Sequence, residues 1–207
     1  MATSKIKIAN LALVKIGGKR ISSFDEDSAF ARAVKEVYDD ARDDVLAEHM
    51  WTFAQKRAVL VQSAIIPVMT EDGMSIVYTP PTDLIKVNFV NIKGAVYRIE
   101  ENGILSNTEG LKIIYTYRND NPITYFSKFT SAFVCKLAYD LCFCITESKS
   151  KAESLLEEYE KIRLPRAIAA DSQQGTPMAP QQDEWLLARQ SGSQYGSTGE
   201  TWHPSWE

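Results

Sequence analysis

The sequence has few of the residues on which most catalytic and metal sites depend. Its 207 residues include two histidines, His49 and His203, and three cysteines. It lacks the glycine patterns G-x-x-x-x-G-K and G-x-G-x-x-G that cradle nucleotide phosphates, and the G-x-S-x-G pattern of many hydrolases. His49 falls at the end of an expected helix, where a lone histidine usually caps carbonyls or packs. The sequence therefore offers no motif for nucleotide binding or for a serine hydrolase.

The three cysteines do not form a disulfide framework. Cys135, Cys142 and Cys144 are an odd number crowded into one apolar segment, which fits a reducing compartment. On a helix, Cys142 and Cys144 point about 200° apart and cannot bind one metal ion together. We therefore expect all three to pack in the core as small hydrophobes, and we predict no metal and no cofactor.

An excess of positive charge and a long apolar run are also lacking. The chain carries 23 Lys and Arg against 27 Asp and Glu, a formal net charge of −4. Tight binding to nucleic acid needs clustered Lys and Arg, so we expect at most passive contact with DNA. No apolar run approaches a membrane span, and lysines interrupt the apolar residues near the N-terminus, so no signal peptide is predicted. We expect a protein made in the cytoplasm without membrane contact.

Helical periodicity marks the two ends of the folded part. Four segments repeat apolar residues as helices do: residues 4–16, 28–50, 127–147 and a segment that opens at residue 150. Gly17-Gly18 favours termination of the first helix. The third is apolar on most of its circumference, which is typical of a central buried helix. A capping box at residues 150–153 opens the fourth, and Pro165 is expected to kink or end it.

The middle of the chain has the composition of strands. Short β-rich runs are separated by turn signals and cover residues 75–79, 85–91, 95–100 and 111–117. Asn102-Gly103 is a good tight-hairpin turn. We predict one antiparallel sheet of three to five strands, inserted between helical segments.

These patterns predict a mainly α fold: an antiparallel helical bundle with an inserted small antiparallel β-sheet module and an extended C-terminal tail. The expected parts are the N-terminal helices of the bundle, the β module, the C-terminal helices of the bundle and the tail, over residues 1–72, 73–121, 122–170 and 171–207.

The predicted tail differs sharply in composition from the rest. Gly, Ser, Thr, Pro and Gln make up 21 of its 37 residues, and its five acids against Arg189 give it a net charge of −4. Such a segment buries too little apolar surface to fold alone. Yet it holds three of the four tryptophans, Trp185, Trp202 and Trp206. Isolated large anchors on a polar segment favour a tail that becomes ordered on a partner; packing back onto its own domain is the alternative.

Carboxylates are plentiful on the second and fourth expected helices. A glycosidase needs two of them at a fixed separation, with one in an apolar pocket. Here the acids alternate with Lys and Arg at helix-surface positions. That pattern is typical of a solvated face or of a contact between subunits.

Four blocks of residues resemble the head-to-tail adaptor family of short-tailed bacteriophages, whose members are also called tail tubular protein A or head completion adaptors. The blocks are "IANLALVKIGGKRISSFDEDS" at 8–28, "YDDARDDVLAEHMWTFAQKRAVL" at 38–60, "YTPPTDLIKVNFV" at 78–90, and residues 111–147, from "IIYTYRND" to "CITES". The second block contains the family's H-x-W-x-F-A pattern and a nearby arginine. The resemblance covers roughly residues 5–170, about four-fifths of the chain.

The resemblance implies a structural, non-enzymatic role in the virion, at the interface of head and tail. It implies a homo-oligomeric ring, expected to be a dodecamer, between the portal protein and the tail nozzle or tail tube protein, through which genomic DNA passes without specific binding. The C-terminal tail would dock on the portal, with the following candidate residues: Trp185, Leu186, Leu187, Tyr195, Trp202 and Trp206. The residues of the H-x-W-x-F-A block are expected to be structural: His49, Trp51, Phe53, Ala54 and Arg57.

Two other functions remain open. One is a peptidoglycan (cell-wall) hydrolase activity, alone or as a second function, which would require a cleft with paired carboxylates. The other is a host-encoded helical regulator that binds a partner through the tail.

Overall fold

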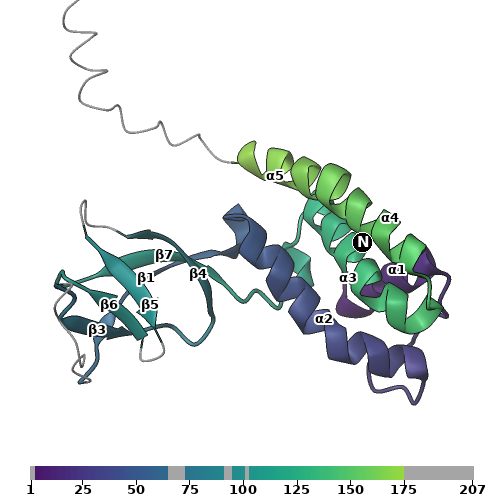
Figure 1. The fold of residues 1–207 in the computed structure, drawn as a ribbon, viewed down its shortest axis with the longest axis horizontal. Helices are drawn as coiled ribbons and strands as arrows, with labels where there is room; N and C mark the ends of the chain where they lie inside the picture. Colours follow the sequence, from purple (N-terminus) through teal and green to yellow (C-terminus); the bar gives the residue numbers. More distant parts are fainter. Residues whose placement is uncertain (1–2, 65–72, 91–94, 101–102, 175–207) are drawn as a thin grey trace, which may run out of the picture. The chain divides into compact units, whose positions relative to one another are not determined.

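The computed structural model describes residues 3–64, 73–90, 95–100 and 103–174, and all that follows concerns these residues (Figure 1). The helices are α1 (Lys5–Ile16), α2 (Ala29–Glu48), α3 (Ser127–Thr146), α4 (Lys149–Glu158) and α5 (Leu164–Ser172). Short 3-10 turns are η1 (Thr52–Ala54) and η2 (Pro122–Thr124), and η3 (Tyr159–Arg163) is a π-helical turn.

Side chains at the helix ends explain where the first two helices begin and stop. The Ser4 hydroxyl accepts a hydrogen bond from the Lys7 N–H, and the Ser28 hydroxyl accepts one from the Ala31 N–H. Gly17 ends α1 with a φ of 84°, in the left-handed region that suits glycine. The predicted boundaries at Ser4, Gly17 and Ser28 are therefore confirmed.

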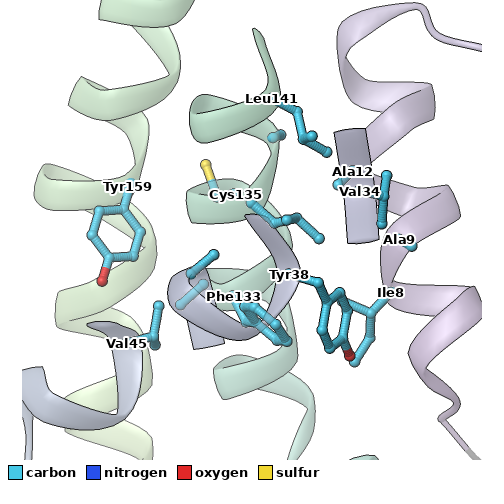
Figure 2. Close-up of a cluster of buried hydrophobic side chains, with 14 of the residues drawn as sticks. Ile8, Ala9, Ala12, Val34, Tyr38, Val45, Phe133, Cys135, Leu141 and Tyr159 are labelled. Carbon is cyan, nitrogen blue, oxygen red and sulfur yellow. The ribbon is translucent and has the colours of Figure 1, made fainter. Parts of the chain in front are cut away.

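Helix α3 is the centre of the helical part. Helices α1, α2, α4 and α5 all contact it, and Figure 2 shows buried side chains of α1, α2 and η3 around those of α3. The core includes Leu13 of α1, Val34 of α2, Phe133 of α3 and Leu155 of α4. Because neighbours surround it, α3 is apolar on most sides, as predicted for a central helix. By length and composition alone, α3 is also the one described helix that qualifies as a membrane span; its role as the core helix accounts for this.

The last helical segment passes Pro165 without ending. Proline lacks an N–H and crowds the carbonyl four residues before it, which breaks a regular α-helix. Here the turn before Pro165 widens to the π form, with the Leu164 N–H bonded to the carbonyl of Tyr159. The N-cap of this segment is Ser148, two residues before the predicted capping box.

The strands form two antiparallel sheets. They are β1 (Gln55–Val59), β2 (Val61–Gln62), β3 (Ile76–Thr79), β4 (Leu84–Val90), β5 (Tyr97–Glu100), β6 (Gly103–Ser106) and β7 (Lys112–Tyr117). One sheet has the order β1-β7-β4 and the other the order β2-β3-β6-β5. In register, Arg57 of β1 lies opposite Ile114 of β7, and Val77 of β3 lies opposite Leu105 of β6.

The two sheets share a small core of their own. Val87 and Tyr115 of one sheet pack in one cluster with Ile104 of the other. Leu60, which lies between β1 and β2, belongs to the same cluster. Gly103 opens β6 at a close approach, because a Cβ there would lie 2.4 Å from the carbonyl oxygen of Tyr78. Glycine is therefore required at this hairpin position, which sequence analysis had assigned to a turn.

The predicted fold class, a mainly α helical bundle, is wrong. The fold is mixed α/β, because helices hold 52% of the described residues, strands hold 20%, and two sheets of three and four strands replace the single small sheet. The prediction missed β1, β2 and β6. Strand β1 follows the H-x-W-x-F-A block directly and is an edge strand; its consecutive polar residues Gln55, Lys56 and Arg57 give neither an apolar run nor the alternation that predicts a strand.

Candidate functional site

The residues of the H-x-W-x-F-A block lie where α2 ends and the sheets begin. Trp51 is completely buried, and its indole N–H donates a hydrogen bond to the carbonyl of Val45, 2.8 Å away. Its ring packs edge-on against Phe129 of α3 at 5.0 Å, and Phe53 packs on the Phe129 ring at 4.7 Å. Ala54 is buried beside them. The block therefore joins the helical core to the start of β1.

Asp171 holds α5 against this joint. Its side chain is 2% exposed and accepts hydrogen bonds from the Thr52 N–H at 3.1 Å and the Thr52 hydroxyl at 2.8 Å. The Nε2 atom of His49 lies 3.4 Å from the same carboxylate. His49 thus packs at a helix end, edge-on to Trp51. Arg57, in contrast, is exposed on β1 and takes no part in the joint.

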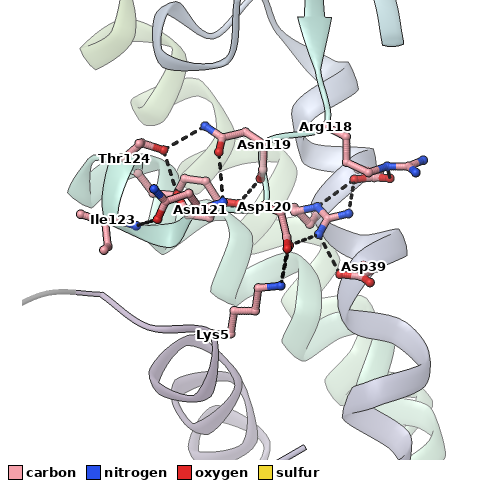
Figure 3. Close-up of polar contacts among 11 residues, drawn as sticks. Lys5, Asp39, Arg118, Asn119, Asp120, Asn121, Ile123 and Thr124 are labelled. Atoms are coloured by element: carbon pink, nitrogen blue, oxygen red, sulfur yellow. Dashed lines mark hydrogen bonds and ion pairs between the residues drawn. The ribbon is translucent and has the colours of Figure 1, made fainter. Parts of the chain in front are cut away.

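A buried arginine of α2 pairs with Asp120 in the segment after β7, and Figure 3 shows Asp120 between Lys5 and Asp39. The Arg42 side chain is 3% exposed and lies within 2.6–2.8 Å of Asp39, Asp43 and Asp120. Burial acts to lower the pKa of Arg42, but the hydrogen bond that Arg42 donates to Asp43 and the charges of all three carboxylates outweigh it, so the pKa is raised. Lys5 of α1 pairs with Asp120 at 2.6 Å.

The same segment is stiffened by its own side chains. The Asn119 amide donates a hydrogen bond to the Thr124 hydroxyl at 2.9 Å, and Asn121 caps η2 by accepting from the Ile123 N–H. The Tyr125 hydroxyl donates to the carbonyl of Asn119 at 2.5 Å. The charged residues around Arg42 are therefore part of a structural joint.

An open groove of about 700 Å³ lies over α3, between α2 and α4. Its apolar lining includes Phe143, which is 63% exposed. Lys136 lies between two of the lining acids, 3.1 Å from Asp44 and 2.9 Å from Asp140. Burial raises the pKa of the Asp140 carboxyl, against the opposing effect of Lys136. The complete lining is Val37, Asp40, Ala41, Asp44, Lys136, Tyr139, Asp140, Phe143, Lys149, Ala152, Glu153 and Leu156.

A second exposed surface lies on the outer side of α1. Leu11 and Val14 are 46% and 49% exposed there, although the opposite side of the helix is fully buried. Lys7 and Arg20 flank them, and within the described residues neither side chain forms an ion pair. This surface, which we call the α1 face, is lined by Ser4, Ile6, Lys7, Asn10, Leu11, Val14 and Arg20.

No group of three or more potential metal ligands occurs within the described ranges. Cys135 and Cys142 are buried, as expected, but Cys144 is exposed. The expectation that all three cysteines pack in the core is therefore wrong for Cys144, which lies near the C-terminal end of α3, beside the exposed Phe143.

The candidate portal-docking residues, from Trp185 to Trp206, lie outside the described residues. Of the residues that matter most in the structure, sequence analysis missed Asp171, which it placed in the tail, and the buried Arg42. The sequence signal for Asp171 is weak, because one acid after an alanine-rich turn does not show which N–H groups it will meet. Comparison with protein-family models and with curated proteins found no match for this chain.

Proposed function

We propose that this chain is a structural subunit of a phage head-to-tail connector, a ring placed between portal and tail that extends the channel for DNA. The observation that carries the proposal is that a tryptophan-rich tail follows a helix end that is fixed to the folded part. Asp171 fixes the end of α5 to the helical core, and three of the four tryptophans follow within the next 35 residues.

This arrangement suits a subunit that reaches a partner from a rigid platform. A tail that becomes ordered on binding loses conformational entropy, and a fixed starting point reduces that cost by limiting the space the tail explores. Large aromatic residues are the side chains that contribute most to protein–protein affinity. The portal protein is the proposed partner of Trp185, Leu186, Leu187, Tyr195, Trp202 and Trp206.

The charge of the chain agrees with a channel component. Residues 171–207 carry the whole net charge of −4, and residues 1–170 are neutral overall. Strong binding to DNA phosphates needs concentrated positive charge. The proposed ring therefore lets DNA pass without holding it.

The alternative, a cell-wall hydrolase, would place its carboxylates in the groove over α3. The Asp44 and Asp140 carboxylates are the pair to test, because burial raises the pKa of Asp140 as a general acid requires. However, the Lys136 ammonium group pairs with both carboxylates, whereas a glycosidase needs a sugar ring or a water molecule between its two acids. This pairing argues against Asp44 and Asp140 as a catalytic pair.

The tail-docking part of the proposal can be tested by truncation after residue 174, which keeps Asp171. The truncated chain should keep the wild-type circular dichroism and lose binding to the portal protein encoded in the same genome, measured by sedimentation. Full-length chain with Trp185, Trp202 and Trp206 replaced by alanine should bind the portal at least about tenfold more weakly, because buried aromatic anchors dominate such affinities. A truncated chain that still saturates the portal would refute the docking role.

A further inference from the structure

The groove over α3 and the α1 face carry opposite charge. The groove is lined by four carboxylates, Asp40, Asp44, Asp140 and Glu153, and by two ammonium groups, which gives a net charge of −2. The α1 face has two cations, Lys7 and Arg20, and no acid, which gives +2. Asp40 forms no ion pair within the described part of the chain, so its charge is available to a partner.

Both surfaces also expose apolar side chains. Phe143 of the groove and Leu11 and Val14 of the α1 face are each between 46% and 63% exposed. Large apolar residues that gather inside a polar rim mark protein interfaces, because their burial against a partner is favourable. The apolar centres of the groove and of the α1 face can pack on each other, because the charged residues around them are of opposite sign.

The two surfaces are built by different helices of one subunit. The α1 face belongs to one helix that packs on α3, while the groove is formed by α2, α3 and α4. A contact between the α1 face of one copy and the groove of the next leaves one surface free on each copy. Contacts of this heterologous kind propagate from copy to copy and close into a ring when the rotation allows.

We propose that the α1 face of one copy of this chain docks into the groove over α3 of the next copy, and that this contact is the lateral seam of the ring. This inference rests on the proposed function and specifies how its subunits join. Leu11 and Val14 would cover Phe143, and Lys7 and Arg20 would face Asp40 and Glu153.

Charge argues for a second copy as the occupant of the groove, against the chain's own C-terminal segment. Residues 175–207 hold four acids and Arg189, a net charge of −3, and would meet a groove of −2. Like charges placed together across an interface cost binding energy. A contact of one groove with the same groove of another copy is opposed for the same reason.

The seam can be tested by exchanging the charges of the two surfaces in the full-length chain. One variant carries Lys7→Glu and Arg20→Glu, which makes its α1 face acidic; the other carries Asp40→Lys and Glu153→Lys, which makes its groove basic. Alone, each variant would bring like charges together, and its self-association measured by sedimentation velocity should weaken at least about tenfold. In an equimolar mixture, both kinds of contact between the variants pair opposite charges, so assembly should return.

Recovery in the mixture also controls for misfolding, because unfolded variants would not assemble. Wild-type association by either variant alone would overturn the seam, and so would a mixture that stays dissociated or a wild-type chain that remains monomeric up to its solubility limit. Portal binding by the tail is measured separately. Failure of the seam would leave that binding intact, whereas failure of the proposed function would leave self-association without a portal complex.

Cysteine cross-linking gives a second readout of the same contact. In a Cys144→Ser background, Leu11→Cys combined with Phe143→Cys should form a ladder of disulfide-linked copies under oxidation. Each single substitution supplies one accessible thiol and should give no disulfide-linked dimer, because a heterologous contact does not bring two α1 faces or two grooves together. A linked dimer from Leu11→Cys alone would show that two α1 faces meet, and would contradict the proposal.

Discussion

The helical part has a much larger buried core than the two sheets. The helices share one core of 27 buried residues arranged around α3, with Trp51 and Phe129 among its largest side chains. The sheets have clusters of seven and three buried residues, and β5 is exposed along its whole length. Since stability scales with buried apolar area, most of it should reside in the helices.

This difference in core size indicates which part of the molecule can hold interaction sites in fixed positions. A large core holds side chains in fixed positions, as the joint around Trp51 and Asp171 requires. The sheets expose apolar residues at their margins, among them Val59, Val61 and Ile99. We therefore expect the helices to set the position of the proposed ring contacts and of the tail, and the sheets to tolerate substitution more readily.

The largest effect should come from breaking the helical core at Trp51. Trp51→Ala removes a completely buried ring and its hydrogen bond to Val45, and should lower the free energy of unfolding by about 3–5 kcal/mol. Urea unfolding followed by circular dichroism measures this. Ile123→Ala is the control, because Ile123 is 71% exposed and its removal should change stability by less than about 0.5 kcal/mol. A loss below about 1 kcal/mol at Trp51 would mean that the helices do not depend on this joint.

A smaller effect should follow from releasing α5. Asp171→Ala leaves the Thr52 N–H and hydroxyl without their acceptor and should cost about 2 kcal/mol. Ser172→Ala is the matched control, because the neighbouring Ser172 is exposed and its hydroxyl bonds only to the carbonyl of Ile168. Equal stability of the two variants in thermal unfolding would show that Asp171 does not anchor the helix.

The smallest effect should be a pH dependence located in the helices. Hydrogen bonds from Lys15 and then Arg163 lower the pKa of Glu158 below its usual value of 4.5. A carboxyl whose pKa is lower in the folded state stabilises the fold above its unfolded pKa, and this contribution is lost as pH falls through the folded pKa. Glu158→Gln should therefore reduce stability at pH 7 by up to about 1 kcal/mol.

The same substitution should have little effect at a pH below the folded-state pKa of Glu158, where the wild-type carboxyl is also uncharged. Denaturant unfolding of both proteins between pH 2 and pH 7 provides the comparison, with about five pH values sufficient to define the curve. A gap between them that does not change with pH would assign the role of Glu158 to packing.

Much of the helical part could be predicted from the sequence because its signals are local. Ser4, Gly17 and Ser28 act within one turn of their own positions. The sheets were harder to predict, since β1 pairs with a strand more than fifty residues away, Gln55 with Thr116. Such pairing depends on tertiary contacts that a short window of sequence does not contain. The fold class was wrong for this reason.

The candidate sites also differ in how far the sequence predicts them. The sequence identified Trp51 and Phe53 as a structural block, and the structure places both in the joint. It did not reveal the groove or the α1 face, because Phe143 and Leu11 read as core residues in an amphipathic or apolar helix, and exposure becomes apparent only when the neighbouring helices are in place. The tail residues stay a prediction.

The most direct test of the connector proposal is electron microscopy of the full-length chain mixed with the portal protein of the same genome. The proposal predicts particles in which a ring of this chain extends the portal along its axis, with density of the tail on the portal surface. Portal rings that remain bare at saturating concentrations of a folded chain would contradict it.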